Sequence, residues 1–130
     1  GMLQGSFDVG SGTAEFSAPQ GEPRVFVIAG GGTGKQTFWR LQRERISFVV
    51  GILSENDVDY PTAHATARHV VREAAGEPDR AGETELLKEA KLWIDRCDHV
   101  ICCGDRAVQA NKYNKELLRY AYRVGKMAEK

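Results

Sequence analysis

A glycine-rich segment early in the sequence has the composition of a site that binds a negatively charged group. The segment follows directly on Arg24–Ala29, an apolar, β-branched run that is typical of a buried strand. Where a strand turns into a helix, the unpaired backbone N–H groups of the helix N-terminus and the helix dipole together attract anions. The side chain of Lys35 adds a positive charge. We therefore predict that a ligand binds at this segment, through Gly30, Gly31, Gly32, Thr33, Gly34 and Lys35.

The segment differs from the Walker A motif of ATPases at two defining positions. That motif starts with Gly and places Ser or Thr directly after Gly-Lys, because the hydroxyl group binds the magnesium ion of the nucleotide. Ala29 and Gln36 occupy these two positions, and Thr37 comes one residue too late. No base that could activate a cysteine nucleophile is identifiable either. We therefore expect no ATPase activity and no catalytic residues in this chain.

The segment also differs from the dinucleotide-binding fingerprint, Gly-x-Gly-x-x-Gly, when the count starts at Gly30. The third glycine of the fingerprint would then fall on Lys35. The surroundings fit better, because Glu55 and Asp57 lie about twenty residues further on, where a ribose-binding acid is expected. Two interpretations stay open: the glycines bind a phosphate, nucleotide or carboxylate, or they only allow the first helix to pack tightly against the sheet.

Two further groups of polar residues follow predicted strands and extend this candidate site. They are Glu55, Asn56 and Asp57 after the run 47–53, and Gly104 and Asp105 after the run 99–103. Ligands of open α/β sheets bind outside the carboxyl ends of the strands. We therefore expect both groups to lie near the glycine-rich segment and to contribute to ligand binding.

No group of residues has the spacing of a metal site. Glu55, Asp57 and Asp59 offer oxygen ligands close together, but a metal ion would need further ligands from elsewhere, and acids after a strand are usually solvated. His64 and His69 are five residues apart, which does not place them on one face of a helix, so we expect both at the surface or at an interface. We predict no metal site, and the sequence identifies no cofactor.

The charge balance and the apolar pattern exclude two classes of partner. The 18 Lys and Arg residues are balanced by 18 Asp and Glu residues, so no net field attracts nucleic acid or anionic lipid. No apolar run has the length of a membrane span, so direct membrane insertion is not expected. The cysteines, Cys97, Cys102 and Cys103, are odd in number with two adjacent, which predicts buried, reduced thiols and a cytoplasmic protein.

Strand and helix patterns alternate along most of the chain. The predicted strands are 24–29, 47–53, 70–71 and 99–103, and the predicted helices are 36–43, 60–67, 84–95 with Thr84 as its cap, and 112–123. This alternation predicts an α/β, Rossmann-like three-layer fold with a mostly parallel sheet. If strand 24–29 lies beside strand 99–103 at a reversal of the strand order, the three polar segments converge on one concave site.

The N-terminal residues differ in composition from the remainder. Residues 1–23 are rich in Gly, Ser and Pro, and Gly10-Ser11-Gly12 separates two short stretches with apolar side chains. This pattern predicts an N-terminal arm or hairpin over residues 1–23, ahead of a Rossmann-like α/β domain over residues 24–130.

Four stretches carry a resemblance to a known family. They are 24–34, 51–60, the strand that ends in Cys102-Cys103-Gly104, and 111–118. Together they resemble the accessory domain that lies C-terminal to the ATPase core in ATP-binding subunits of ABC transporters of the iron-siderophore and cobalamin uptake class. The resemblance implies a non-catalytic domain that regulates or senses a ligand. It also implies the ATPase core or the permease as partner, and a cytoplasmic location peripheral to the membrane through the transporter complex.

Two other classes of function remain as alternatives. One is an NAD(P)-dependent oxidoreductase or a nucleotide-binding enzyme subunit, which needs an acid that reaches the ribose and an adenine slot beside it. The other is a structural oligomerisation module, for example a homodimer, in which the protein's own side chains fill the crevice at Gly30 to Gly34. Our leading hypothesis is that the domain binds a small anionic ligand at the glycine-rich segment, or docks a partner.

Overall fold

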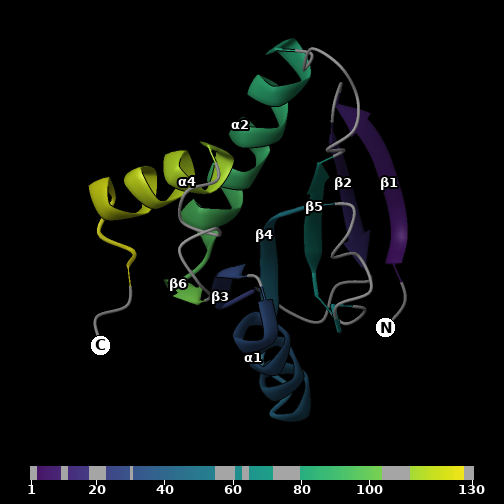
Figure 1. Cartoon of the computed structure of the whole chain (residues 1–130), viewed down its shortest axis with the longest axis vertical. Coiled ribbons are helices and arrows are strands. Elements are labelled where there is room, and N and C mark those ends of the chain that lie inside the picture. The colour runs from purple at the N-terminus through teal and green to yellow at the C-terminus, as the bar shows by residue number, and fades with distance from the viewer. Residues whose placement is uncertain are drawn as a thin grey trace.

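Four parallel strands form the centre of the fold, in the order β5-β4-β3-β6 (Figure 1). The computed structural model describes residues 3–9, 12–17, 23–29, 31–54, 61–62, 65–71, 80–103 and 112–127. The parallel strands are β3 (Val25–Ala29), β4 (Phe48–Ser54), β5 (Ala67–Val71) and β6 (His99–Cys103). The strand order therefore reverses between β3 and β6, which pair directly.

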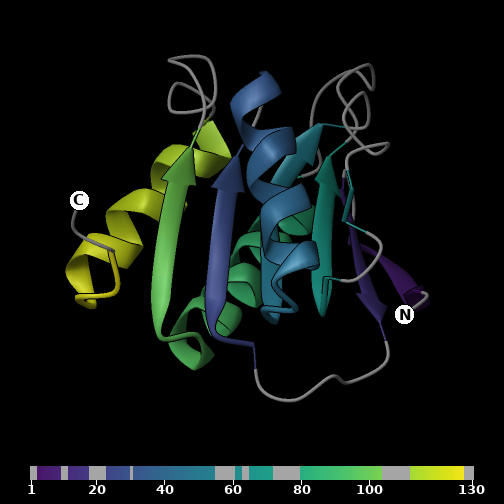
Figure 2. The ribbon, with the colours of Figure 1, turned by 90° about the horizontal axis from the view of Figure 1, so that it is seen from below.

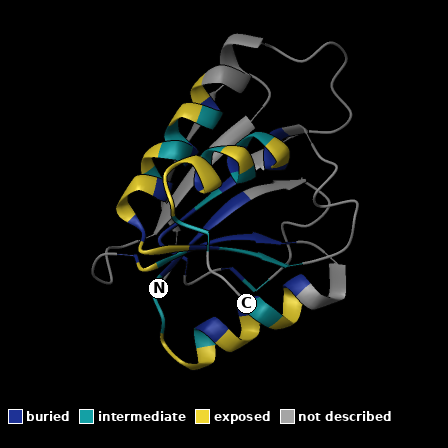
Figure 3. Ribbon diagram, turned by 90° about the vertical axis from the view of Figure 1, so that its left-hand side faces the viewer, coloured by how far each residue is buried: buried dark blue, intermediate teal, exposed yellow. Residues whose placement is uncertain are grey.

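Helices cover both faces of this sheet. The helix α1 (Gly31–Arg43) lies on one face, and α2 (Arg80–Arg96) and α4 (Lys112–Arg123) lie on the other (Figures 2 and 3). The sheet is thus the middle of three layers, and the predicted α/β, Rossmann-like fold is confirmed. Within the described parts of the chain, no helix has both the length and the apolar character that a membrane span requires.

Side chains of the central strands alternate between the two faces and form two buried clusters. Phe26 and Ile28 of β3 pack toward α2 and α4, whereas Val27 and Ala29 pack toward α1. The first cluster also contains Val49, Ala67, Leu86, Ala90, Ile94, Cys97, Val100, Tyr113, Leu117 and Ala121, and the second Phe38, Leu41, Phe48, Val50 and Ala65. β3 and β4 are buried on both faces, as their continuous apolar runs predict.

The N-terminal strands extend the sheet beyond β5. β1 (Leu3–Val9) and β2 (Gly12–Ser17) pair antiparallel as a hairpin, and β2 pairs antiparallel with β5. The predicted hairpin is confirmed, and it is continuous with the parallel strands rather than separate from them. β5 is consequently an interior strand with neighbours on both sides.

The helix predicted over 60–67 is wrong for the described residues of that range. Ala67 is already the first residue of β5, and residues 61, 62, 65 and 66 are not helical. The N–H group of Thr66 donates to the carbonyl oxygen of Phe48 at 2.8 Å, so this segment is already joined to β4.

Two helices begin earlier than predicted. α1 begins at Gly31 rather than at Gln36, and α2 begins at Arg80, so Thr84 lies inside the helix and is not its cap. Both helix starts are predicted from the helical spacing of apolar residues. This spacing indicates only the turns that pack against the core, so a first turn without apolar side chains is missed. The large buried side chains of the described α1 begin at Phe38, about two turns after the helix itself begins at Gly31.

The chain returns to the sheet after α4. Gly125 has a φ of 71°, and its N–H donates to Tyr122 while that of Lys126 donates to Ala121, the hydrogen bonds of a Schellman cap. The N–H of Val100 then donates to the carbonyl of Lys126 at 2.7 Å, and Met127 forms a parallel bridge with Val100. The segment after α4 thus pairs with the edge of β6 at Val100.

Candidate functional site

The reversal of strand order places a candidate ligand site at the carboxyl ends of β3 and β6. Ala29 and Cys103, the last residues of these strands, are partners in the parallel register. From β3 the chain enters α1 on one face of the sheet, whereas α4, the next helix that the structure describes after β6, lies on the other face (Figure 2). Chains that leave neighbouring strands toward opposite faces open the crevice in which α/β proteins bind ligands.

The glycine-rich segment is the first turn of α1, which corrects the prediction of a loop. β3 ends at Ala29 and α1 begins at Gly31, so Gly31, Gly32, Thr33 and Gly34 are helical. The first N–H groups of a helix have no partner within it, and here they lie at the carboxyl edge of the sheet. No acidic side chain occupies this first turn. The arrangement can therefore hold a negatively charged group by backbone N–H donation and by the helix dipole.

Gly34 holds this helix start directly against the end of β3. A Cβ atom added at Gly34 would lie 3.0 Å from the Cβ of Ala29 and 3.2 Å from its carbonyl carbon. Close packing of helix on strand is the task of the third glycine in the dinucleotide fingerprint. The count that fits the structure therefore starts at Ala29, with Gly31 second and Gly34 third. Our count from Gly30 missed this register, and the end of the strand at Ala29 was the signal that could have shown it.

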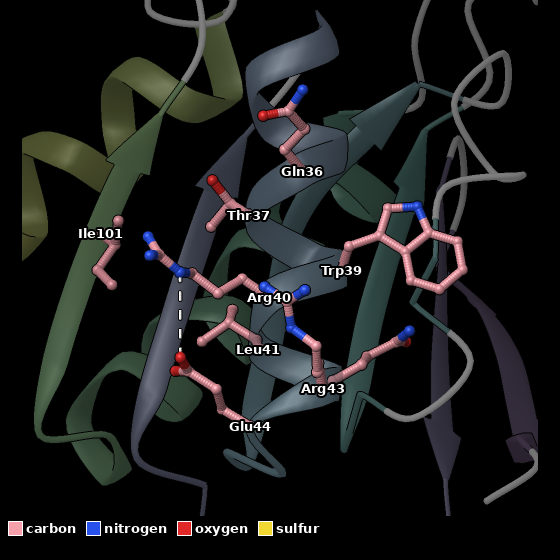
Figure 4. A pocket seen from close by; sticks show the side chains of 9 residues that line it. Gln36, Thr37, Trp39, Arg40, Leu41, Arg43, Glu44 and Ile101 are labelled. Carbon is pink, nitrogen blue, oxygen red and sulfur yellow. Dashed lines mark ion pairs between the residues drawn. The ribbon is translucent and has the colours of Figure 1, made fainter.

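The side chains that follow the glycines divide between solvent and the sheet. Lys35 and Gln36 are exposed, while Thr37 is half-buried and extends toward β6 (Figure 4). A P-loop wraps the phosphates with several residues between strand and helix. Here a single position separates β3 from α1, so the segment lacks the length as well as the hydroxyl position of that motif.

The other predicted site residues directly follow strand ends that the structure describes. β4 ends at Ser54 and β6 at Cys103, both at the same edge of the sheet as the start of α1. Gly30, Glu55, Asn56, Asp57, Gly104 and Asp105 themselves lie outside the described residues. The structure therefore brings together Gly31, Gly32, Thr33, Gly34 and Lys35 with the ends of β4 and β6. Within the described ranges, no three His, Cys, Asp or Glu side chains are grouped as metal ligands would be.

His69 is fully buried, which contradicts its predicted surface position. It lies on the interior strand β5, where the register with β4 shifts between Val49 and Ile52. Its Nδ1–H donates to the carbonyl oxygen of Val50 at 2.9 Å, within this irregularity. Burial lowers the pKa of His69 to about 4, and the hydrogen bond to Val50 opposes this only in part. The imidazole is therefore neutral and ties β5 to β4, the strand that leads to Glu55.

The three cysteines, all within the described residues, form no disulfide. Cys97 is buried in the cluster below α2 and α4, in agreement with the prediction. Cys102 and Cys103 are half-buried, which differs from the prediction of buried thiols. As consecutive strand residues they point to opposite faces, and Cys103 packs toward α1 beside the candidate site.

Comparisons with known proteins place the chain in a family. Neither the curated proteins nor the solved structures gave a match. Residues 48–128 match the family described as the MJ0874 family. This range holds β4, β5, α2, β6 and α4, and leaves the hairpin, β3 and α1 outside it. Because the match spans well over half of the sequence, the chain belongs to the MJ0874 family.

Proposed function

We propose that this protein is a non-catalytic, ligand-sensing domain that binds a small anionic molecule between the ends of β3 and β6. The observation that carries the proposal is the start of α1 at Gly31, a single position beyond the end of β3 at Ala29 and at the reversal of strand order. Phosphate or carboxylate groups suit this position, since the donors are backbone N–H groups and the nearby side chain of Lys35 is positively charged.

We further propose that the domain serves an ABC-type importer of iron-siderophore complexes or cobalamin. The support is the resemblance of residues 24–34 and 51–60 to the accessory domain of the ATP-binding subunits of such transporters. In this role the domain would meet the ATPase core or the permease in the cytoplasm, at the inner face of the membrane. Binding of the anionic ligand would then report its concentration to the transporter.

The second candidate function is that of an NAD(P)-dependent oxidoreductase or of a nucleotide-binding enzyme subunit. One observation favours it: β5-β4-β3-β6 follows the order of the first four strands of the dinucleotide-binding fold, and Gly34 packs as the third glycine does. Glu55 then follows the second parallel strand, where a ribose-binding acid belongs. The two candidates share the anion site and differ in whether an adenosine group occupies the space beside it.

A thermal-shift screen separates the candidates. We would test inorganic phosphate, ATP, NAD, NADP, cobalamin and a ferric siderophore, each against the unmodified protein. A ligand at one hundred times its dissociation constant adds about 2.7 kcal/mol, which raises the Tm by roughly 10 °C in a domain of this size. Stabilisation by the chelates or by phosphate alone supports the sensing domain. Stabilisation by NAD or NADP far above that by phosphate supports the enzyme subunit, and no shift with any of them contradicts both.

A further inference from the structure

A groove runs along the face of the sheet that carries α1. It has a volume of about 1130 Å³; most of its lining comes from residues 36, 37 and 39–44 of α1 and the turn after it, and β6 contributes Ile101. Thr37, Arg40, Leu41 and Glu44 extend toward the β6 side, where Ile101 lies across from them, whereas Trp39 extends to the other side of α1 (Figure 4). Pockets for small molecules commonly measure about 300–1,000 Å³ and surround most of the ligand, so this larger groove, open to solvent, suits a chain segment better.

The groove marks a place where the helical layer is incomplete. On the opposite face, beneath α2 and α4, Val100 of β6 is fully buried and Cys102 is half-buried. On the α1 face, α1 is the sole helix within the described residues (Figure 3), and Ile101 and Cys103 are both half-buried. Sheets of this class bury both faces beneath helices. A second helix beside α1 would cover the exposed part of β6 and complete the layer.

The charges around the groove are predominantly positive. α1 and the turn after it carry Lys35, Arg40, Arg43 and Arg45 against the single acid Glu44, although the whole chain is balanced. All five side chains belong to exposed residues. The pair between Arg40 and Glu44 spans 4.0 Å with the two side chains 73% and 54% exposed, so it contributes little to stability. An occupant with negative charge is therefore attracted to this groove.

We propose that the groove between α1 and β6 binds an amphipathic helix of a partner protein, with an apolar stripe over Ile101 and acidic residues facing Arg40 and Arg43. A second copy of this chain fits less well, because it would bring two positive surfaces together. A membrane surface is flat and would leave the groove unfilled. The proposal does not depend on the ligand site, which lies at the start of α1 rather than along its length.

The test uses a labelled synthetic peptide, helical and amphipathic, with Leu on one face and Glu on the other, and follows fluorescence anisotropy. We expect the unmodified protein to bind it, and the exposed double substitution Arg40→Glu/Arg43→Glu to weaken binding at least about tenfold. Ile101→Asp should weaken binding similarly. Ile101→Thr keeps the β-branched strand residue and should show a smaller loss in the same direction, even if the Asp variant is poorly folded.

A matched control carries the same change of net charge on the opposite face. Lys88→Glu/Lys115→Glu alters exposed residues of α2 and α4 and should bind the peptide as the unmodified protein does. Equal binding by the Arg40→Glu/Arg43→Glu variant, or equal binding of a peptide with its Leu residues scattered over all faces, contradicts the proposal. So does a dimer in analytical ultracentrifugation that Ile101→Asp or Ile101→Thr dissolves. Binding to phosphatidylglycerol vesicles in place of the peptide also contradicts it.

Discussion

Gly34 lies so close to Ala29 that an added Cβ atom would be 3.0 Å from the Cβ of Ala29. This contact fixes the first turn of α1 on the last residue of β3. The N–H groups of that turn are consequently held at the point where the strand order reverses. The position of the proposed anion site thus follows from one close approach between two small residues.

The first prediction concerns that contact. Ala has the higher helix propensity, so Gly→Ala in a helix ordinarily stabilises by about 0.5–1 kcal/mol. At Gly34 the crowding against Ala29 outweighs this gain, and we expect Gly34→Ala to lower the free energy of unfolding by about 1 kcal/mol. Urea denaturation measures the change, with Gly32→Ala in the same turn as the control. If both variants are equally stable, the contact does not constrain the helix.

The second prediction is a loss of stability in acid through His69. Its pKa is about 4 in the folded protein, whereas an unperturbed imidazole has a pKa of 6.5. Between these values the unfolded chain binds a proton that the folded protein excludes, so the stabilisation is complete above pH 6.5 and disappears as pH falls toward 4. This difference corresponds to about 3 kcal/mol. Urea denaturation at a series of pH values measures it.

Two variants assign that pH dependence to one ring. His69→Asn keeps an N–H donor for the carbonyl of Val50 and cannot titrate, so its stability should vary much less between pH 6.5 and 4. His99→Asn changes an exposed residue and should retain the profile of the unmodified protein. A His69→Asn profile as steep as that of the unmodified protein would exclude His69 as the source.

The third prediction compares two contacts between α2 and α4. Leu117 of α4 is fully buried in the core cluster to which Leu86 and Ala90 of α2 also belong, and Leu117→Ala should cost about 2–5 kcal/mol. Lys91 and Glu116 form a 3.0 Å ion pair with their side chains 30% and 37% exposed, and this bond is the main reason that the pKa of Glu116 is lowered. Lys91→Met should cost less than about 1 kcal/mol, because solvent screens the pair. If Lys91→Met lowered the free energy of unfolding more than Leu117→Ala does, the conclusion that apolar packing stabilises this part of the fold more than the ion pair would be contradicted.

The fourth prediction is that the protein does not hydrolyse ATP. Ala29 and Gln36 stand at two defining positions of the Walker A motif, and a single position separates β3 from α1. A coupled assay for ADP with magnesium present should give no turnover above the blank. Turnover that is lost in the Lys35→Ala variant would show that this segment is a working ATPase loop.

The sequence was informative where apolar periodicity reaches both ends of an element. Strand 99–103 and helix 112–123 have the predicted bounds, since their apolar side chains recur over their whole length. It was misleading at 60–67, where Ala65 and Ala67 suit a helix as well as a strand. Ala67 is in a strand because it pairs with Val49 of β4, and the local sequence around Ala67 does not indicate this long-range pairing.

The position of the candidate site could be predicted from the sequence, but the alignment of its glycines with the dinucleotide-binding fingerprint could not. The neighbouring strands β3 and β6 follow from the reversal expected of this fold, and the ends of β4 and β6 lie where they were expected. The register of the glycines depends on where the strand stops, and it stops at Ala29, one residue before the first glycine. The burial of His69 could not be foreseen from the sequence around it, because it depends on pairing between β5 and β2 of the N-terminal hairpin, which is distant in the sequence.

The most direct test of the proposed site follows backbone amide resonances by NMR in 15N-labelled protein. Inorganic phosphate is titrated first, and then each compound that stabilises the protein in the thermal-shift screen. We expect the largest shifts at the amides of Gly31, Gly32 and Thr33, with smaller shifts at Cys103, and Gly32→Val should abolish them because a side chain blocks the approach to these amides. If the amides of residues 31–33 stay unchanged while another surface responds, the protein binds its ligand elsewhere and the glycines serve only to pack α1 on β3.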